Sequence, residues 1–251
     1  DVVFTICEEV GLLGAKHLDL NLVRAKTGLV LDSDSIGFLI TKAPAANFVE
    51  FEIHGMEAHA GICPERGISA IQVAAQGIAA MQLGRIDDDT TANLGLVSGG
   101  TAVNILPGRI TLTGEVRSHD EDKLERQTQA MLKCLEEAAA NAKVSVDGHI
   151  HEARVEFQIR RQYDQMNVPH EAAIVQRVHA AARNLGLAVD TVSKGGGCDA
   201  NVLNKRGLQV ANLASGMRDI HTVHEWLDVN DLVAAGRIIQ EVVRLEGCQA
   251  P

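Results

Sequence analysis

The opening of the chain alternates short apolar runs with a helical stretch. The apolar, β-rich run at residues 2–6 predicts a fully buried strand, and the pattern of residues 12–18 predicts a helix. Two more short strands are predicted at residues 29–31 and 36–41, around the polar turn Asp32-Ser33-Asp34-Ser35. Alternating strands and helices are typical of an α/β domain with a largely parallel sheet.

A differently patterned block follows the connector at residues 42–46, whose proline suits a domain boundary better than the interior of an element. Over residues 47–161 the pattern predicts strand, helix, strand, strand, helix and strand, the order of a split βαβ, ferredoxin-like module. The predicted strands span residues 48–53, 93–97, 109–116 and 154–159, and the predicted helices span residues 69–81 and 120–142. Apolar and polar residues alternate in the third of these strands, so one face of the sheet is expected to meet solvent.

The α/β pattern resumes after residue 164. Helices are predicted at residues 171–185, 199–204 and 229–245, and strands at residues 189–192 and 208–213. The simplest architecture is an α/β sheet domain formed by residues 1–46 and 162–251, interrupted by an inserted α+β domain at residues 47–161. Because a chain rarely begins with a central strand, the run at residues 2–6 indicates that the α/β domain is truncated at its N-terminus.

Composition and charge narrow the possible functions. The chain has 251 residues, of which 46% are apolar, and a formal net charge of −10, which argues against nucleic-acid binding because that requires clustered Lys and Arg. No apolar run approaches the roughly 20 residues of a membrane helix, and no signal peptide is visible. The cysteines are odd in number and form no CxxC pair, which favours a reducing cytoplasm over a disulfide framework. They are Cys7, Cys63, Cys134, Cys198 and Cys248.

Carboxylates follow two of the predicted strands. Glu8 and Glu9 end the first strand before Gly11 and point to different sides of the chain, so one can bind a metal while the other polarises a metal-bound water. Taken by itself, such a pair is more often a solvated helix N-terminus. Asp32 lies at the tip of a later strand, where ordinary turn chemistry is the alternative to a ligand role.

A glycine run precedes the predicted helix at residues 199–204. Gly195, Gly196 and Gly197 expose backbone N–H groups and allow a substrate to approach closely. The alternative is a flexible loop in which Asp199 caps the helix.

Histidine, asparagine and arginine supply further candidates. His221 lies in a polar loop, where a neutral imidazole is a plausible zinc ligand, although a loop histidine without a ligand role is the alternative. His224 is interpreted as a surface residue. In the inserted domain, His59, Asn104 and Arg117 are donors suited to an oxyanion or a carboxylate, or simply to loop and surface hydrogen bonds.

The order of these motifs is more specific than any one of them. In sequence they read FTxxEEVGLLGAK, VLDSD, HGxxAHAG, GGTAxNxLP, GGGxDAN and GMxxxHTxHEW. This series closely resembles the co-catalytic zinc peptidases of the aminoacylase and carboxypeptidase superfamily, and most of all the peptidase T-like tripeptidases, over essentially the whole chain. The resemblance implies a cytoplasmic, homodimeric aminopeptidase that acts on short peptides with two zinc ions per complete site, for which Co or Mn can substitute.

The resemblance assigns roles to four residues of the α/β domain. It makes Glu8 the general base and Glu9 a zinc ligand. Asp32 matches the carboxylate ligand of the other zinc, and His221 matches the late histidine ligand.

It also assigns roles around the substrate. His59 resembles the histidine that stabilises the tetrahedral oxyanion, in many dimeric relatives from the facing subunit. Asn104 and Arg117 match positions that hold the carboxylate end of the substrate, and Gly195, Gly196 and Gly197 resemble the loop that lines it.

The sequence departs from the family pattern at its start. The family's His-x-Asp motif and its metal-bridging Asp would precede Asp1, and Cys198 stands where Ser or Thr is usual. Glu9, Asp32 and His221 alone do not complete two zinc sites. We therefore expect an incomplete centre with weak activity or none, and an N-acyl amino acid amidohydrolase, a carboxypeptidase or a non-catalytic dimerising chain remain as alternatives.

Overall fold

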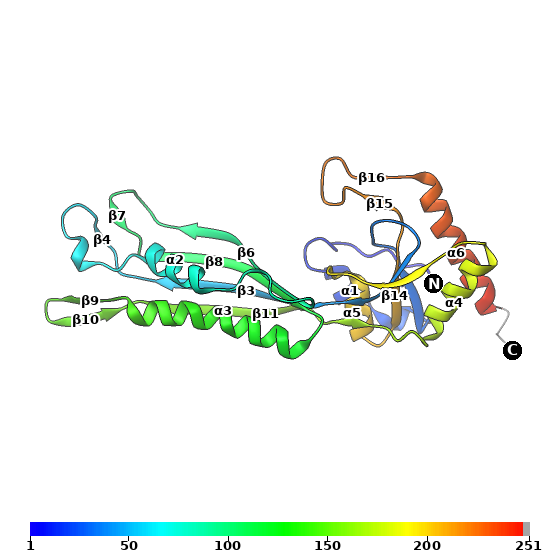
Figure 1. The fold of residues 1–251 in the computed structure, drawn as a ribbon, viewed down its shortest axis with the longest axis horizontal. Coiled ribbons are helices and arrows are strands. Elements are labelled where there is room, and N and C mark those ends of the chain that lie inside the picture. Colours follow the sequence, from blue (N-terminus) through cyan, green and yellow to red (C-terminus); the bar gives the residue numbers. More distant parts are fainter. Residues whose placement is uncertain (248–251) are drawn as a thin grey trace. The chain divides into compact units, whose positions relative to one another are not determined.

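The protein folds into two compact units, which a computed structural model describes for residues 1–247 (Figure 1). One unit, called unit 1 below, consists of Asp1–Pro44 and Tyr163–Pro251, and the other, unit 2, of Ala45–Gln162. The chain leaves unit 1 at Pro44, a single residue between two strands. Cys248 lies outside the described residues.

Unit 1 is built on a mixed sheet. Its strands are β1 (Thr27–Val30), β2 (Phe38–Ala43), β12 (Met166–Asn167), β13 (Asp190–Ser193) and β14 (Gln209–Leu213). The pairs β1–β14 and β13–β2 are parallel, whereas β14–β2 and β12–β2 are antiparallel. The α/β class is as predicted, but the expected predominance of parallel pairing is wrong because β14 and β12 both run opposite to β2.

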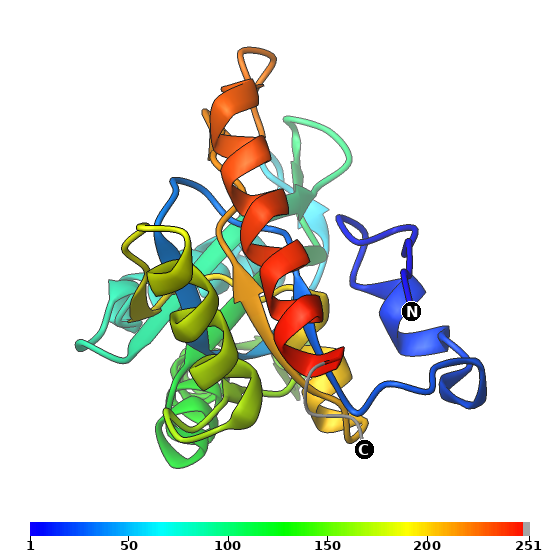
Figure 2. The ribbon, with the colours of Figure 1, turned by 90° about the vertical axis from the view of Figure 1, so that its right-hand side faces the viewer.

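The helices of unit 1 pack with this sheet around one shared hydrophobic core. They are α1 (Leu13–His17), the short 3₁₀ turn η1 (Leu20–Leu22), α4 (Ala173–Asn184), α5 (Asp199–Lys205) and α6 (Val229–Gly247). Figure 2 shows α4 and α6 side by side, in contact with each other. Apolar residues of both helices pack with those of the strands, among them Leu39, Val175, Val178, Leu213 and Ile238.

The N-terminal run at residues 2–6 is not the buried strand that its composition predicts. It has no regular structure, and Val2, Phe4 and Ile6 are 85%, 91% and 74% exposed. A buried strand needs neighbours that pair with its backbone and cover its side chains. Among the strands of residues 1–247, none pairs with this run, so its apolar side chains face solvent.

Unit 2 has the predicted ferredoxin-like order. Its long strands are β3 (Ala45–His54), β6 (Thr90–Gly99), β8 (Arg109–Ser118) and β11 (Arg154–Tyr163), and its helices are α2 (Ala70–Ala80) and α3 (Glu121–Asn141). With the short β5 (Gly84–Arg85), the sheet order is β11-β3-β8-β6-β5. Buried and half-buried residues alternate along β3 from Asn47 to His54. The buried set packs with apolar residues of α2 and α3, which leaves the half-buried set on the opposite face.

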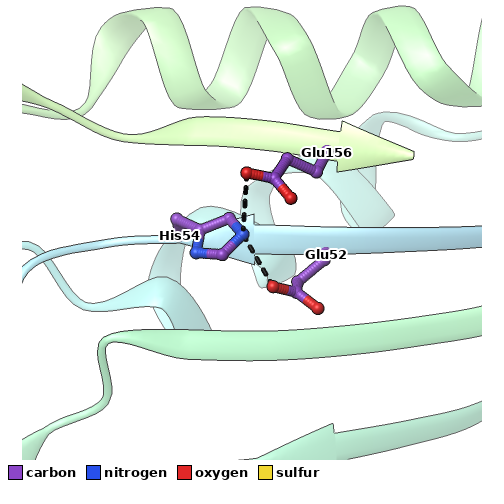
Figure 3. Close-up of side chains that lie close together, drawn as sticks. All are labelled: Glu52, His54 and Glu156. Carbon is purple, nitrogen blue, oxygen red and sulfur yellow. Dashed lines mark ion pairs between the residues drawn. The ribbon is translucent and has the colours of Figure 1, made fainter.

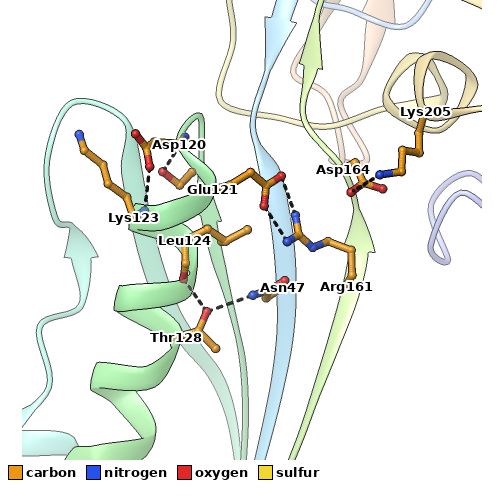
Figure 4. A network of polar contacts seen from close by, with 10 residues as sticks. Asn47, Asp120, Glu121, Lys123, Leu124, Thr128, Arg161, Asp164 and Lys205 are labelled. Atoms are coloured by element: carbon orange, nitrogen blue, oxygen red, sulfur yellow. Dashed lines mark hydrogen bonds and ion pairs between the residues drawn. The ribbon is translucent and has the colours of Figure 1, made fainter.

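The long helix α3 begins where its sequence predicts. The Asp120 carboxylate caps it by accepting a hydrogen bond from Lys123 N at 2.8 Å. About two turns beyond Asp120, buried Asn47 of β3 donates from Nδ2 to Thr128 Oγ1 at 3.2 Å, which ties the helix to the sheet (Figure 4). Arg161 of β11 makes a bidentate ion pair with Glu121 at 3.0 and 2.7 Å.

Several short elements carry too few residues to show a period in the sequence. A hairpin joins β9 (Lys143–Val146) to β10 (His149–Glu152) through Asp147-Gly148, both with positive φ, as an Asp-Gly turn favours. The remaining elements are β4 (Ala58–His59), β7 (Ile105–Leu106), β15 (Met217–Arg218), β16 (Trp226–Leu227) and the 3₁₀ turn η2 (Pro64–Arg66). Among the described residues, no helix is both long and apolar enough to span a membrane.

Close contact between α2 and α3 yields a first prediction. A Cβ added at Gly77 of α2 would lie 2.5 Å from Leu135 Cδ2 and 3.2 Å from Leu135 Cα on α3. We expect Gly77→Val to lower the free energy of unfolding by about 1–3 kcal/mol, because overpacking displaces one helix. Exposed Ala79 of the same helix is the control, and Ala79→Val should cost less than about 0.7 kcal/mol. Equal losses in urea unfolding of the two variants would contradict the packing described.

Candidate metal centre

A tight turn holds the two glutamates that follow residues 2–6. The N–H groups of Gly11 and Leu12 donate to Glu8 O at 3.1 and 2.8 Å, and Cys7 and Leu12 adopt left-handed φ angles of 56° and 60°. Gly14 N donates to Ile6 O at 2.9 Å, and a Cβ at Gly14 would lie 2.6 Å from Ile6 N, which no side chain tolerates. Gly14 of the motif is therefore required by the backbone of the turn itself.

Asp32 is fixed through its backbone by the neighbouring strand. Buried Asn212 of β14 donates from Nδ2 to Asp32 O at 2.6 Å and accepts from Asp32 N at 3.0 Å. The same amide donates to Cys198 Sγ at 3.4 Å, ahead of α5. Because β1 and β14 run parallel, their carboxyl ends meet at one edge of the sheet, where Asp32 emerges.

His221 is presented by the loop between β15 and β16. Its backbone is left-handed, with φ of 64°, and its N–H donates to Glu225 Oε2 at 3.1 Å. Trp226 Nε1 donates to Asp219 Oδ2 at 3.1 Å across the same loop. His221 Nδ1 lies 3.5 Å from Glu9 Oε2, so two predicted ligands from opposite ends of the chain are brought together.

The electrostatics place five ionisable groups near one another. Burial, followed by the charges of Asp32, Glu9 and Asp199, raises the pKa of Glu8 to about 7, and His221 opposes this rise. Burial and the charges of Glu9 and Asp199 also raise the pKa of Asp32. Four of these groups are carboxyls, with one imidazole among them, and the charge of Glu225 adds to the rise in the pKa of Asp32.

Asp199 is a part of this group that the sequence interpretation missed. The sequence also suggests it as the cap of α5, but the cap is Cys198, whose N–H donates a hydrogen bond to Asn201 Oδ1 at 3.1 Å. Asp199 is 5% exposed, and its Oδ1 has no hydrogen-bond partner among the described residues. A buried carboxylate oxygen without a partner is costly, so this environment favours a bound cation.

These residues fit a divalent metal. Carboxylate oxygens and a neutral imidazole nitrogen are the donors that Zn²⁺ takes in proteins, and Mn²⁺ and Co²⁺ accept the same set. Glu9 and His221 already lie in contact, Asp32 interacts with both, and Asp199 holds an unsatisfied oxygen. A bound cation would relieve the repulsion among these groups.

The glycine run has one structurally required member. A Cβ at Gly197 would lie 2.4 Å from Cζ of Tyr163, so the ring and a side chain cannot both fit. Added Cβ atoms at Gly195 and Gly196 would meet nothing within 4 Å. Packing therefore explains the third glycine, and the loop is open at the first two, as a substrate-lining segment requires.

The predicted residues of unit 2 fall into two separate places. His59 lies on β4 opposite Ile105 of β7, and Ala60 N donates to Asn104 O at 2.9 Å, which brings His59 and Asn104 close. Arg117 lies near the C-terminal end of β8, where it donates hydrogen bonds to Glu115 at 2.8 and 3.0 Å.

This separation has a consequence for the substrate. The eight residue-to-residue steps from Arg109 to Arg117 span about 26 Å at about 3.3 Å each, and Asn104 lies beyond the Arg109 end. Within one chain Asn104 and Arg117 are therefore not brought together on a single carboxylate, contrary to the simplest interpretation of the sequence.

Part of unit 2 matches a known protein family. Residues 46–143 match the family model of the M20 peptidase dimerisation domain. Over 244 residues the chain is 37% identical to YqjE, an uncharacterized protein of Bacillus subtilis (strain 168), covering 97% of this chain and 63% of YqjE. It is 27% identical over 256 residues to acetylornithine deacetylase of Myxococcus xanthus, covering 96% of this chain and 63% of that protein.

Two solved structures are similar over nearly the whole chain. The aminopeptidase PepT from Bacillus cereus ATCC 10987 has a TM-score of 0.82 at 36% identity, covering 95% of this chain and 62% of that one. A tripeptidase from Staphylococcus aureus subsp. aureus mu50 has a TM-score of 0.89 at 32% identity, covering 98% and 63%. The chain spans less than two thirds of the length of each of these four proteins.

These findings support a peptidase T-like member of the M20 peptidase family. The resemblance expected from the ordered motifs is thereby confirmed, together with the α/β sheet and the inserted module.

The raised pKa of Glu8 predicts how stability depends on pH. The folded state binds this proton more tightly than the unfolded state, because the pKa of about 7 exceeds the ordinary value of 4.5. With metals chelated, the free energy of unfolding should therefore fall as pH rises from about 4.5 to about 7. Glu8→Gln should flatten this fall and unfold at a higher temperature than the unmodified protein at pH 8.

Calorimetry across this pH range checks the expectation. The exposed Glu171 of the same unit provides the control, since Glu171→Gln should leave the pH profile unchanged. An unaltered profile in Glu8→Gln would contradict the described environment of Glu8.

Proposed function

We propose that the chain carries the metal ligands and the general base of a zinc-dependent aminopeptidase that removes the N-terminal residue of short peptides. The observation that carries the proposal is the approach of His221 Nδ1 to Glu9 Oε2 at 3.5 Å, beside Glu8 and Asp32. Similarity to an aminopeptidase and to a tripeptidase supports the substrate class.

The metal would be held by Glu9, Asp32 and His221. Zinc suits this donor set, with cobalt or manganese as substitutes. When bound, the metal supplies a Lewis acid that polarises the scissile carbonyl and lowers the pKa of water. The backbone clamp of Asn212 on Asp32 and the left-handed turn at His221 orient two of these ligands before any metal arrives.

Glu8 is the proposed general base. A base is most effective when its pKa lies near the working pH, and that of Glu8 is about 7. In the proposed reaction, the carboxylate takes a proton from the attacking water and returns it to the leaving amine. Since the repulsion of neighbouring carboxylates contributes to this pKa, a bound cation is expected to lower it.

The remaining roles follow the family resemblance. We assign His59 to the oxyanion, Asn104 and Arg117 to the substrate's carboxylate end, and the loop of Gly195, Gly196 and Gly197 to the substrate wall. Because His59 and Asn104 lie far from Arg117 within unit 2, a homodimer in which the partner supplies the first two accommodates these assignments better than one chain does. The match to a dimerisation domain supports this homodimer. We propose the cytoplasm as its compartment.

Mutations can distinguish the residues that bind the metal from the residue that acts as the general base. We expect Glu8→Gln to retain zinc and to lose, by about 10²- to 10⁴-fold, the weak hydrolysis of Ala-Ala-Ala expected of an incomplete centre, because only the proton acceptor is removed. His221→Ala should lose both zinc and activity, while His224→Ala, an exposed histidine of the same loop, should lose neither. Elemental analysis and amino-acid release, with zinc, cobalt and manganese each supplied, measure the two effects. Zinc retained in His221→Ala would refute the ligand assignment.

An N-acyl amino acid amidohydrolase is the second candidate. The 27% identity to acetylornithine deacetylase favours it, and the proposed ligand set serves both reactions. Cleavage of acetylated amino acids in preference to Ala-Ala-Ala would select this candidate over the tripeptidase.

A non-catalytic dimerising chain is a third possibility, favoured by the match over residues 46–143. Light scattering and metal analysis on the same sample distinguish it. A zinc-free dimer without hydrolytic activity supports the non-catalytic chain, whereas zinc in stoichiometric amount supports the peptidase.

A further inference from the structure

A second group of potential metal ligands lies in unit 2, apart from the residues discussed above. Glu52 and His54 stand two positions apart on β3, so their side chains share one face of the sheet. Glu156 comes from β11, the strand beside β3, and reaches the same place (Figure 3). One ligand atom from each of the three residues lies within 4.8 Å of the others.

The histidine nitrogen at the centre of this group is unsatisfied. His54 Nε2 is shielded from solvent and has no hydrogen-bond partner in residues 1–247. Glu52 Oε1 lies 2.7 Å away, but off the direction in which the ring nitrogen bonds, and Glu156 Oε1 lies 3.6 Å away. Figure 3 shows one carboxylate oxygen on either side of this nitrogen. Two carboxylates around an unbonded imidazole nitrogen leave a place for a positive charge.

The spacing suits a metal ion. Bonds of about 2.0–2.1 Å from zinc to nitrogen and oxygen place neighbouring tetrahedral ligands about 3.3 Å apart. The distances of 2.7 and 3.6 Å from His54 Nε2 to the two oxygens lie on either side of that value, so small side-chain rotations bring all three atoms onto one ion. A fourth position would remain open to water, because the Glu156 side chain is 60% exposed.

Each of the two carboxylates also forms an ion pair with an arginine. Arg109 binds Glu52 through Oε2, which leaves Oε1 toward His54. Arg154 Nη2 lies 3.1 Å from Glu156 Oε1, the same oxygen that approaches His54. Arg109 therefore orients one ligand, whereas Arg154 competes with an incoming cation for the other.

We propose that Glu52, His54 and Glu156 form a divalent-metal site, with zinc as its natural probe, that links β3 to the edge strand β11. This site is independent of the proposed peptidase centre, because its ligands all belong to unit 2. Its expected effect is structural: a bound ion fixes the edge strand and raises the melting temperature of the protein.

Zinc titration of the full chain tests the site, with competition against a chromophoric chelator. The unmodified protein should bind one more zinc per chain than His54→Ala. Glu156→Gln should weaken that zinc by more than about tenfold, because it removes a direct ligand. Arg154→Ala should tighten it, since a competing cation is gone. The control is His151→Ala, an exposed histidine on β10 of the same unit.

Opposite results overturn the proposal. Equal zinc stoichiometry and affinity in His54→Ala and the unmodified protein would leave the three residues as a cluster of charged and polar side chains that binds no metal. Equal losses in His54→Ala and His151→Ala would mean that zinc binds surface histidines indiscriminately. If His54→Ala does not fold by circular dichroism, the exposed Glu156 and Arg154 decide, and unchanged affinity in both of their variants refutes the site.

Discussion

Repulsion between carboxylates is the constraint on which unit 1 depends. Four of them lie together at the edge of the sheet, where the charge of His221 opposes theirs. They are Glu8, Glu9, Asp32 and Asp199. Left to itself, such a group would spread apart or take up protons. The carboxylates cannot move apart, because the Asn212 side chain hydrogen-bonds to the backbone of Asp32 and a closed turn fixes Glu8. The raised pKa of Glu8 shows that this carboxylate takes up a proton more readily than usual.

In unit 2, by contrast, charged side chains form pairs of opposite sign. Its long strands and helices pair acids with bases, as in Arg161 with Glu121 and Arg117 with Glu115. Its apolar residues face two helices through a regular alternation that the sequence shows directly. A module of this kind is stable through packing and needs no ligand for its fold, which suits a domain whose relatives use it for association. The unsatisfied nitrogen of His54 stands out against this background.

Much of the fold could be predicted because local patterns and tertiary packing agree in unit 2 and in the helices. Helix α3 begins at its capping Asp120 and buries the stripe that its sequence marks. Residues 2–6 were misassigned because apolar content specifies a need for burial but does not supply the neighbouring strand that satisfies it. The antiparallel entry of β14 and β12 was missed because strand direction is set by long-range pairing.

The candidate site was predictable in part for a similar reason. Glu9 and His221 were identified from ordered motifs, and the structure brings them into contact. Asp199 was overlooked because its local sequence fits a helix cap equally well, and only burial separates the two roles. Asn212 gave a weak signal, a lone polar residue in the otherwise apolar end of β14, whose function depends on the distant Asp32.

The left-handed turns around the site bear on how such a protein can be engineered. Cys7, which precedes the proposed base Glu8, and His221, itself a proposed ligand, both have positive φ angles. For a residue with a side chain this conformation costs free energy. Laboratory selection for heat resistance alone would favour glycine at these positions, since it accepts the same conformation without strain. At His221 that gain removes a proposed ligand, so thermostabilisation campaigns on this scaffold should hold the turns constant and seek their improvements in the packed module instead.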